Sequence, residues 1–570
     1  TVNPIKDLSV TGSMVYEFTG NNQKVIPVFH DFWNFSNNTI LVEGKGQSYI
    51  KQLNNRYERN FMDIVANYSH RFLEDRLGFG IMAGASQERY TEEKETTERK
   101  DLIDSSLSVM DAANGELSAS GSKQVWAMRS YFGRINLDWE NKYLAEFNLR
   151  SDGSSRFLQG NRYGWFPSGS VAWRISEEEF MKEYDWLDNL KIRASYGSLG
   201  NNSVGNYASR STYSNATYVI NGLAQTGWKI ANLANPLLTW EKTNVTDIGL
   251  DFNVLNNRLS GTFDYFNKKT DGILIQLPIP SVHGTAKAAT TNAAEVSNKG
   301  IELTLGWNDR IGDFSYGITM NYTHIKNTID KFQGEDYSLD GYKYIKEGGS
   351  IGDMYMYETD RIIQSDADLK LVDDMIAANP KAFEALGRVP TKGDVLFKDL
   401  DHNGVIDTED RTVAGNTNPT DYLGLNLYVA YKGIDLSISM DGAFGYQGYI
   451  NENYFSTSVS KDHQLSKYVV ENAWREGVTN AKYPRLSSQG IIATDNNNTT
   501  WMQNRDFWKI RNIQLGYTFP KLLTQKIFVQ KLRVYGSLEN FFTITGWKGI
   551  DPETDNLVYP TMRQAVVGIN

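Results

Sequence analysis

The sequence has no cysteine among its 570 residues, only 13 prolines, and no apolar run of the length, about 18 residues, that marks a membrane-spanning helix. The lack of cysteine excludes disulfide bridges and avoids oxidation hazards in an oxidising envelope, although many proteins lack cysteine by chance. The lack of a long apolar run excludes a transmembrane helix. A membrane remains compatible with the sequence, because the strands of a transmembrane β-barrel alternate and their hydropathy averages out.

Lysine and arginine, 58 in all, are outnumbered by the 68 aspartates and glutamates. The formal net charge is -10 and the isoelectric point is about 5.3. Such a surface disfavours nucleic acid as a partner, because binding to phosphates needs clustered lysine and arginine. Aromatic residues, in contrast, are abundant at 12%, with 32 tyrosines and 13 tryptophans. The chain is too long for one soluble core of ordinary size.

The clearest pattern lies in residues 506–549, which predict two long strands joined by a short polar turn. In the second strand one face carries Leu532, Val534, Gly536 and Leu538, and the other carries Arg533, Tyr535, Ser537 and Glu539. This period of two separates an apolar face from a polar one. Aromatic residues crowd the strand ends. Long alternating strands with aromatic ends are typical of a transmembrane β-barrel, whereas the strands of a soluble sandwich are usually shorter.

Connections of two kinds alternate along the chain. Short turns are predicted at 73–76, 140–141, 255–257, 309–313 and 432–433, and long loops at 91–122, 198–235, 327–420 and 446–500. Transmembrane barrels show this asymmetry, with short periplasmic turns and long extracellular loops. We count roughly sixteen strands by their alternation, with a helical composition at 368–386 inside the third loop. The predicted fold class is therefore an all-β, antiparallel transmembrane β-barrel.

Several phrases of the sequence resemble the SusC/RagA family of TonB-dependent outer-membrane transporters of Bacteroidetes. The resemblance follows chain order over nearly the whole sequence. The phrases are NLRSDGSSRF (148–157), NLKIRASYGSLGN (189–201), VSNKGIELTLGW (296–307), GDVLFKDLDHNGVIDTEDRTVAGNTNP (393–419), KIRNIQLGYTFP (509–520) and LRVYGSLENFFTITGWKGIDPE (532–553).

The resemblance implies a barrel in the outer membrane, with outer-membrane lipid around it, of the class that has about 22 strands and a plugged lumen. It implies import of oligosaccharides or peptides, energised by TonB–ExbB–ExbD, with a SusD-like surface lipoprotein as partner and no enzymatic activity. In the family a TonB box and a plug domain precede the barrel, and nothing like them is found in this sequence. We therefore expect residues 1–570 to be the C-terminal part of such a barrel.

One segment in the third loop has the spacing of a calcium-binding loop. Oxygen ligands are expected from Asp399, Asp401, Asn403, the carbonyl of Val405, Asp407 and Asp410, with Gly404 at the sharp turn. An aspartate in the last position reaches less far than the usual glutamate, so the loop resembles a dockerin loop more than an EF-hand. The expected cofactor is a structural Ca²⁺ that stiffens an extracellular loop. The alternative is a turn held only by its own Asx hydrogen bonds.

Other interpretations remain open at this level. The aromatic run from Gly352 to Tyr357 fits either a sugar-stacking surface or ordinary loop packing. A soluble or surface-anchored all-β glycan-binding protein is the alternative to a transporter. A glycosidase would need two carboxylates at a set separation in space. No G-x-S-x-G nucleophile motif occurs, and the six histidines show no metal-ligand spacing.

Overall fold

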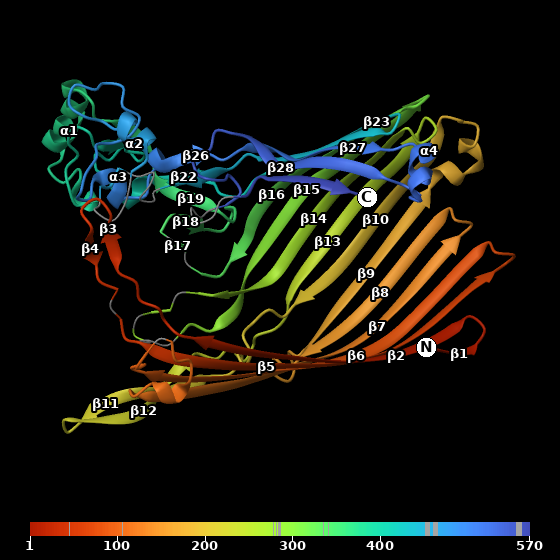
Figure 1. Ribbon diagram of the computed structural model, residues 1–570, viewed down its shortest axis with the longest axis horizontal. Helices are drawn as coiled ribbons and strands as arrows, with labels where there is room; N and C mark the ends of the chain where they lie inside the picture. Colours follow the sequence, from red (N-terminus) through yellow and green to blue (C-terminus); the bar gives the residue numbers. More distant parts are fainter. Residues whose placement is uncertain are drawn as a thin grey trace. The chain divides into compact units, whose positions relative to one another are not determined.

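The computed structural model describes residues 1–44, 46–104, 106–277, 279–280, 282, 287–334, 336–339, 341–450, 457–459, 465–554 and 561–570. Its architecture is all-β, with 17 strands in one large antiparallel sheet (Figure 1). No helix of the described residues is both long and apolar enough to cross a membrane. The prediction of an all-β antiparallel fold is confirmed.

The strands of the large sheet are mostly long. They are β1 (Val2–Ile5), β2 (Leu8–Val25), β5 (Tyr49–Phe72), β6 (Leu77–Lys100), β7 (Leu117–Trp139), β8 (Tyr143–Ser154), β9 (Tyr163–Arg174), β10 (Leu187–Asn201), β13 (Glu241–Val254), β14 (Leu259–Gln276), β15 (Thr290–Ile311), β16 (Phe314–Phe332), β23 (Asp421–Tyr431), β24 (Ile434–Phe444), β27 (Phe507–Thr518), β28 (Arg533–Thr545) and β29 (Gln564–Ile569).

Shorter elements occupy the connections. The strands among them are β3 (Phe32–Asn34), β4 (Thr39–Val42), β11 (Thr212–Ile220), β12 (Leu223–Asn232), β17 (Tyr337–Leu339), β18 (Lys343–Ile345), β19 (Asp353–Tyr357), β20 (Thr359–Ile362), β21 (Val395–Phe397), β22 (Arg411–Asn416), β25 (Gln447–Tyr449) and β26 (Met502–Asn504). The helices are α1 (Asp366–Ala378), α2 (Lys467–Asn472), α3 (Ile492–Asp495) and α4 (Lys521–Thr524).

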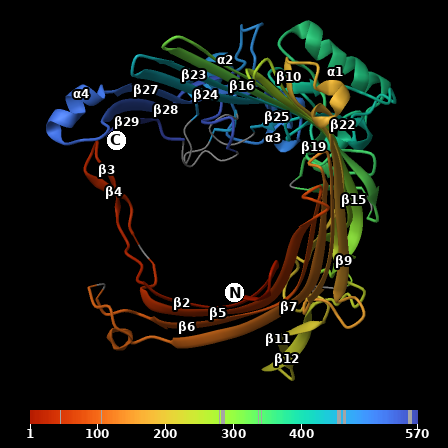
Figure 2. The ribbon, with the colours of Figure 1, turned by 90° about the vertical axis from the view of Figure 1, so that its right-hand side faces the viewer.

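The chain forms two compact units. The first comprises Thr1–Ala172, Ser195–Asn244 and Asp271–Asn292, and the second comprises Trp173–Ala194, Val245–Thr270 and Ala293–Asn570. In the first unit β2, β5, β6 and β7 lie side by side (Figure 2), and β5 pairs with β6 from Tyr49↔Lys100 to Phe72↔Leu77.

The predicted loop at 91–122 is much shorter in the structure. Strand β6 continues to Lys100 and β7 begins at Leu117, so residues 101–116 connect them. Residues 91–122 predict a loop because they are charged and then rich in serine, glycine and alanine. Opposite charges support the strand instead, with Lys51 at 3.4 Å and Lys123 at 3.6 Å from glutamates of β6. Cross-strand pairs of opposite charge can therefore support strand pairing without an apolar face.

In the second unit the strand pairs follow chain order. Strand β15 pairs with β16, β16 with β23, β23 with β24, β24 with β27, β27 with β28, and β28 with β29, all antiparallel. Figure 1 shows α1, α2 and α3 gathered at one end of these strands and α4 at the other. Long and short connections of this unit therefore lie at opposite ends of its sheet, as the alternation of loop lengths predicts.

The short turns have left-handed backbone, which matches the right-handed twist of paired strands. Glu140 and Asn141 have φ of 54° and 55°, and Lys432 and Gly433 have φ of 45° and 90°. The turn predicted at 309–313 is tighter than expected, because β15 continues to Ile311 and Gly312, at φ 62°, makes the reversal.

One face of the sheet exposes large apolar side chains. In β7, Tyr131, Ile135, Leu137 and Trp139 are between 37% and 49% exposed, and they alternate with Ser130 and other polar residues. An extended apolar surface of this kind needs an apolar environment, since water would not stabilise it. In a transmembrane barrel that environment is lipid.

The buried apolar clusters lie mainly in the connections. The largest packs residues of the connection between β16 and β23 against residues of the connection between β24 and β27; its buried members are Tyr357, Ile363, Val372, Ala382, Phe383, Leu386, Val395, Leu396, Phe397, Ile406, Ile491, Ile492, Ala493 and Trp501. We call the described residues within 333–420 and 445–506 together the loop domain. A sheet with lipid on one face and water on the other buries little between layers, so the loops carry the packed core.

Candidate functional site

The loop domain is a packed body rather than a pair of loose loops. Ser365 caps α1 in a reciprocal capping box with Asp368, which fixes the start of the helix. Val372 of α1 is fully buried in the shared core. From the second connection, Trp501 is 1% exposed and its indole donates to the carbonyl of Ala493 at 2.7 Å. The two connections therefore fold together.

The predicted calcium loop lies on this body. Asp399, Asp401 and Asp410 each place a carboxylate oxygen within 4.8 Å of the other two. Val405 precedes Ile406, which is fully buried in the core and whose amide donates to the carbonyl of Ala382 at 2.8 Å. This packing fixes one end of the loop, so the geometry can hold a cation between three carboxylates.

The same carboxylates also accept hydrogen bonds from the loop backbone. Asp399 accepts from the amides of Asn403, at 3.2 Å, and Gly404, at 2.8 Å. Asp410 is fully buried, accepts from Leu400 and Asp407, and has its pKa raised by burial. Backbone donors and a cation are compatible ligands of one carboxylate, because each oxygen has two lone pairs.

Two of the predicted ligands have other contacts. The amide nitrogen of Asn403 donates to Asp401 at 2.7 Å and its oxygen accepts from Val405 at 2.7 Å. Asp407 lies outside the three-carboxylate group and caps a short 3₁₀ turn through the amide of Glu409 at 2.8 Å. The structure thus brings together three of the predicted carboxylates and gives Asn403 and Asp407 a role in the turn.

The aromatic run from Gly352 to Tyr357 belongs to the packing of the loop domain. Tyr357 is 1% exposed and stacks on Phe397 with ring centroids 4.7 Å apart. Tyr355 stacks on Tyr344 at 4.3 Å. The packing interpretation of this run is therefore the right one, because its rings are engaged with other rings of the same domain.

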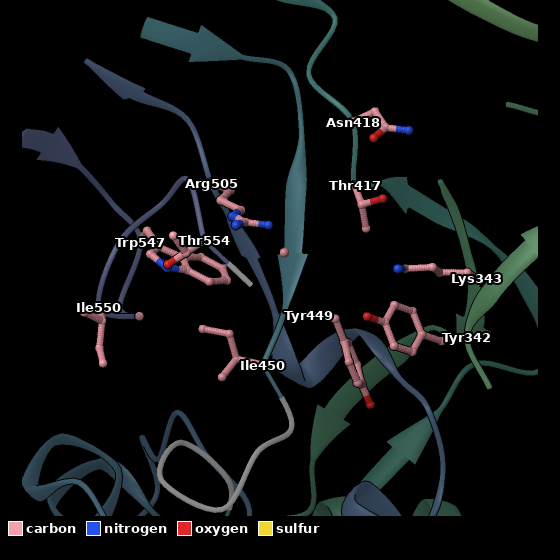
Figure 3. Close-up of a pocket in the computed structure, with 12 residues that line it drawn as sticks. Tyr342, Lys343, Thr417, Asn418, Tyr449, Ile450, Arg505, Trp547, Ile550 and Thr554 are labelled. Atoms are coloured by element: carbon pink, nitrogen blue, oxygen red, sulfur yellow. The ribbon is translucent and has the colours of Figure 1, made fainter. Parts of the chain in front are cut away.

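A pocket of about 340 Å³ opens beside the loop domain (Figure 3). One wall consists of Tyr342, Lys343 and Tyr449, and the rings of the two tyrosines are 4.7 Å apart. The opposite wall includes Arg505 and Trp547. Figure 3 shows the side chains of Lys343 and Arg505 extending from opposite sides toward the space between them. The pocket thus combines aromatic rings with two cations.

The wall with Trp547 is part of a segment that we call the strap, residues 546–554. Asp551 of the strap binds Lys509 of β27 at 2.7 Å, and the two side chains are only 6% and 3% exposed. Glu553 binds both Lys509 and Arg511, the latter at 2.8 Å. The carbonyl of Pro552 accepts from Tyr446. This set of contacts fastens the strap to the sheet.

A second pocket, of about 460 Å³, lies next to the first and shares Thr417 and Arg505 with it. Its acidic members are Asp441 and Glu553, and both are paired with Arg511. Their charges are compensated within the wall.

The sequence matches the family model described as TonB dependent receptor-like, beta-barrel, over residues 8–358. That segment is more than half of the chain. The chain belongs to this family. Its relatives include TonB-dependent receptor P3 of Formosa agariphila, 27% identical over 544 residues, which cover 90% of this chain and 52% of the relative. TonB-dependent receptor SusC of Bacteroides thetaiotaomicron is 30% identical over 453 residues, which cover 77% of this chain and 43% of the relative.

Solved structures support the fold of this TonB-dependent receptor chain. The RagAB peptide transporter has a TM-score of 0.82 at 23% identity, covering all of this chain and 60% of that chain. The chain spans about half the length of the curated relatives it matches. The predicted membership of the SusC/RagA family is confirmed. The family consists of outer-membrane β-barrel receptors and transporters rather than enzymes, so the glycosidase and the soluble glycan-binding protein are set aside.

The polar strand face of the receptor carries one dense ionic cluster. Arg193 of β10 binds Asp247 at 3.0 Å, Asp251 at 3.2 Å and Asp264 at 2.6 Å. The guanidinium crosses over Gly249 of β13, where an added Cβ would lie 2.5 Å from the Arg193 Cζ and 2.3 Å from an Asp264 oxygen. The glycine is therefore what lets the three strands share one arginine.

Sequence reasoning missed the strap, the pocket and this cluster. Lys509 and Asp551 are 42 residues apart, and the alternation of β27 shows only that Lys509 lies on the polar face. A signal was present in the family-like phrase GWKGIDPE, whose two carboxylates follow a tight glycine-rich segment. Nothing in a single sequence pairs them with a particular strand.

Proposed function

We propose that this receptor imports an oligosaccharide or a peptide across the outer membrane, driven by TonB, together with a SusD-like lipoprotein. The match to the receptor family over residues 8–358 carries the proposal. Two further observations support it. The relative from Bacteroides thetaiotaomicron is named SusC, and the RagAB structures are described as a peptide transporter and a peptide importer.

The pocket is consistent with such a role. It is lined by Thr417 and Asn418, by residues around β18 and β25 and by the strap, which are the long connections at one end of the strands. Loops held on a rigid sheet are the usual place for binding residues. A ligand bound there would meet aromatic rings and polar groups from several segments at once.

The test is uptake of fluorescent oligosaccharides and peptides by cells that carry the complete gene, a deletion of it, or a deletion of tonB. We expect uptake of one class of ligand that is lost in both deletions. Surface binding should persist without tonB, because energy is needed for transport and not for binding. Uptake that is equal in all three strains would refute the proposal. Pull-down of the tagged receptor should bring with it a surface lipoprotein.

We also propose that the loop at 399–410 binds Ca²⁺ as a structural ion. Its support is the approach of the Asp399, Asp401 and Asp410 carboxylates to within 4.8 Å of one another. The ion would offset the repulsion of three carboxylates and hold the loop to the domain core. Direct measurement of Ca²⁺ bound to the purified receptor, with Mg²⁺ as competitor, tests this.

A further inference from the structure

We propose that residues 519–532, the connection between β27 and β28, anchor the receptor in the phospholipid leaflet at the periplasmic end of its barrel. We call these residues the basic connection. In this role its exposed apolar side chains enter the acyl region of the leaflet, and its lysines bind anionic phospholipid headgroups. The inference uses the outer-membrane barrel and is independent of what the receptor imports.

The basic connection lies at the short-turn end of the second unit. Strand β27 ends at Thr518, and its residue Tyr517 pairs with Ile434, which follows the short turn at 432–433. Figure 1 shows α4, which belongs to the basic connection, at the opposite end of the strands from α1, α2 and α3. Short turns of transmembrane barrels lie on the periplasmic side. The basic connection is described without a gap, and it is much longer than the turn beside it.

Large apolar side chains of the basic connection are open to the surroundings. Leu522 is 80% exposed and Phe528 is 98% exposed. Leu523 and Ile527 are also more than half exposed, whereas Thr524 is buried. The basic connection thus has a packed side and an apolar side that nothing in the described part of the chain covers. An apolar surface of this kind marks a contact with another molecule or with a membrane.

Phe528 occupies a backbone position that disfavours a side chain. Its φ is 59°, in the left-handed region. The amides of Phe528 and Val529 close the helical turn on the carbonyls of Gln525, at 3.2 Å, and Thr524, at 3.0 Å. Glycine is the usual residue at such a helix end, because it has no side chain to strain. The ring gains no packing within the described residues in return, so its contact is expected outside them.

A row of exposed aromatic rings sets the depth of the basic connection. Phe314 pairs with Tyr431. Ile434 pairs with Tyr431 and with Tyr517, so the three rings lie on one face of the sheet. They are between 38% and 48% exposed. The ring of Tyr517 meets that of Phe519 edge-on, with centroids 4.9 Å apart. Aromatic girdles mark the interfaces of membrane barrels, so a segment that starts at Phe519 begins at headgroup level.

The face with this aromatic row is the one that meets lipid. The opposite face carries Asp435 and Arg533, which are bound to each other at 3.0 Å. Charged pairs of a barrel belong on its wet face, because a charge on the lipid face is destabilising. The basic connection therefore continues from the lipid-facing side of its strands.

The charge of the basic connection selects the kind of lipid. Lys521, Lys526 and Lys531 belong to it, and it contains no aspartate or glutamate. The three lysines are exposed and form no ion pair with the described residues. The neighbouring connection at 175–186 also exposes Phe180 but is acidic. Lysines beside an apolar surface favour a membrane with anionic headgroups, since the two attractions act together.

Site-directed labelling tests where the basic connection lies. Residues 1–570 contain no cysteine, so Phe528→Cys introduces one thiol there, and any thiol elsewhere in the full-length protein is replaced first. The protein, expressed from its complete gene, is labelled with an environment-sensitive fluorophore and placed in nanodiscs of phosphatidylethanolamine and phosphatidylglycerol. We expect strong quenching by lipids brominated on their acyl chains and weak quenching by acrylamide in the water. Phe35→Cys is the matched control, because Phe35 is 92% exposed in the long connection between β2 and β5, and acrylamide should quench it strongly.

The same label tests the lysines. Brominated phosphatidylglycerol should quench residue 528 more strongly than brominated phosphatidylcholine. Replacing the three lysines with glutamine should lower that preference about fivefold, the factor expected for one lysine at an anionic surface. Added salt should lower it in the unaltered protein. The control variant removes three exposed lysines of the loop domain and should keep the preference; its changes are Lys370→Gln, Lys381→Gln and Lys467→Gln.

Every result decides the inference. Lipid quenching at residue 528 with a lysine-dependent preference for phosphatidylglycerol supports it. Acrylamide quenching that is equal at residues 528 and 35 would overturn it, since the basic connection would then lie in water. Protection from both quenchers would overturn it as well, because protein would then cover the ring. A preference that both triple variants keep, or that both lose, would refute the role of the lysines. A heat-induced gel shift shows that each variant has folded.

Discussion

Replacing Lys509 with methionine should release the strap. Lys509 and Asp551 form a pair that is almost completely buried, 2.7 Å apart. Breaking a buried pair by removing one partner costs about 3–5 kcal/mol. We expect the lower value, about 3 kcal/mol, because Asp551 keeps the amide of Glu553 and the hydroxyl of Thr561 as donors, and Arg511 still binds Glu553. That energy corresponds to an increase of about 150-fold in the opening equilibrium of the strap.

Hydrogen exchange followed by mass spectrometry measures this opening directly. Amides in residues 546–554 should exchange about 150-fold faster in Lys509→Met. Amides of β27 and β28 should change little. Lys521→Met, at an exposed lysine of α4, is the matched control. The double variant Lys509→Met with Asp551→Leu should regain most of the protection, because an apolar pair can replace a buried ion pair without loss. Unchanged exchange in the single variant, or a double variant as open as the single one, would refute the reasoning.

Three further predictions concern the strap, the ionic cluster at Gly249 and the acidic loop at 399–410. The pKa of Asp551 and of Glu553 is lowered: burial opposes this, but hydrogen bonds from Lys509 and, for Glu553, Arg511 outweigh it. Exchange protection of the strap should therefore be complete above pH 4.5, the ordinary pKa of a glutamate, and be lost as pH falls below 3.8, that of an aspartate. Gly249→Ala should lower the fraction of folded, heat-modifiable protein on a gel, because its Cβ would lie 2.3 Å from Asp264. Ca²⁺ should protect residues 393–419 from proteolysis, and Asp401→Asn should remove that protection.

The last two of these predictions each have a control variant in the chain. Gly424→Ala, on β23, meets no heavy atom closer than 3.5 Å and should fold normally. Asp373→Asn changes an exposed aspartate of α1 and should leave the effect of Ca²⁺ intact. Strap protection that does not change between pH 7 and pH 3 would contradict the role given to Asp551 and Glu553. Equal folding of the two glycine variants would contradict the crowding described at Gly249.

Alternation predicted the inner parts of the strands well. The turn predicted at 432–433 is where the structure has it, because strand β23 ends at Tyr431 and strand β24 begins at Ile434. Both lie where one face is apolar and the other polar, which is the condition for a period of two. The prediction failed at the outer ends of β6 and β7, which lie within the loop predicted at 91–122. There the residues of both faces are mostly polar, so the sequence carries no periodic signal.

Sites were predictable only where their residues are neighbours in the sequence. The acidic loop at 399–410 could be proposed as a calcium site because its carboxylates follow one another at fixed spacing. The pocket draws Lys343, Asn418, Arg505 and Trp547 from four distant segments. Their approach depends on how the loops pack, and a packed loop leaves no short-range pattern. The resemblance of whole phrases to a family identified the receptor class, but it gave no contact between those phrases.

The shared core of the loop domain limits how this receptor can be altered. Ile363 and Val372 come from one connection and Ile492 and Trp501 from the other, with the β23–β24 hairpin between them in the chain. A graft that exchanges one connection with that of a relative would place mismatched halves against each other. Chimaeras meant to transfer substrate choice should therefore take both connections together from the same parent protein.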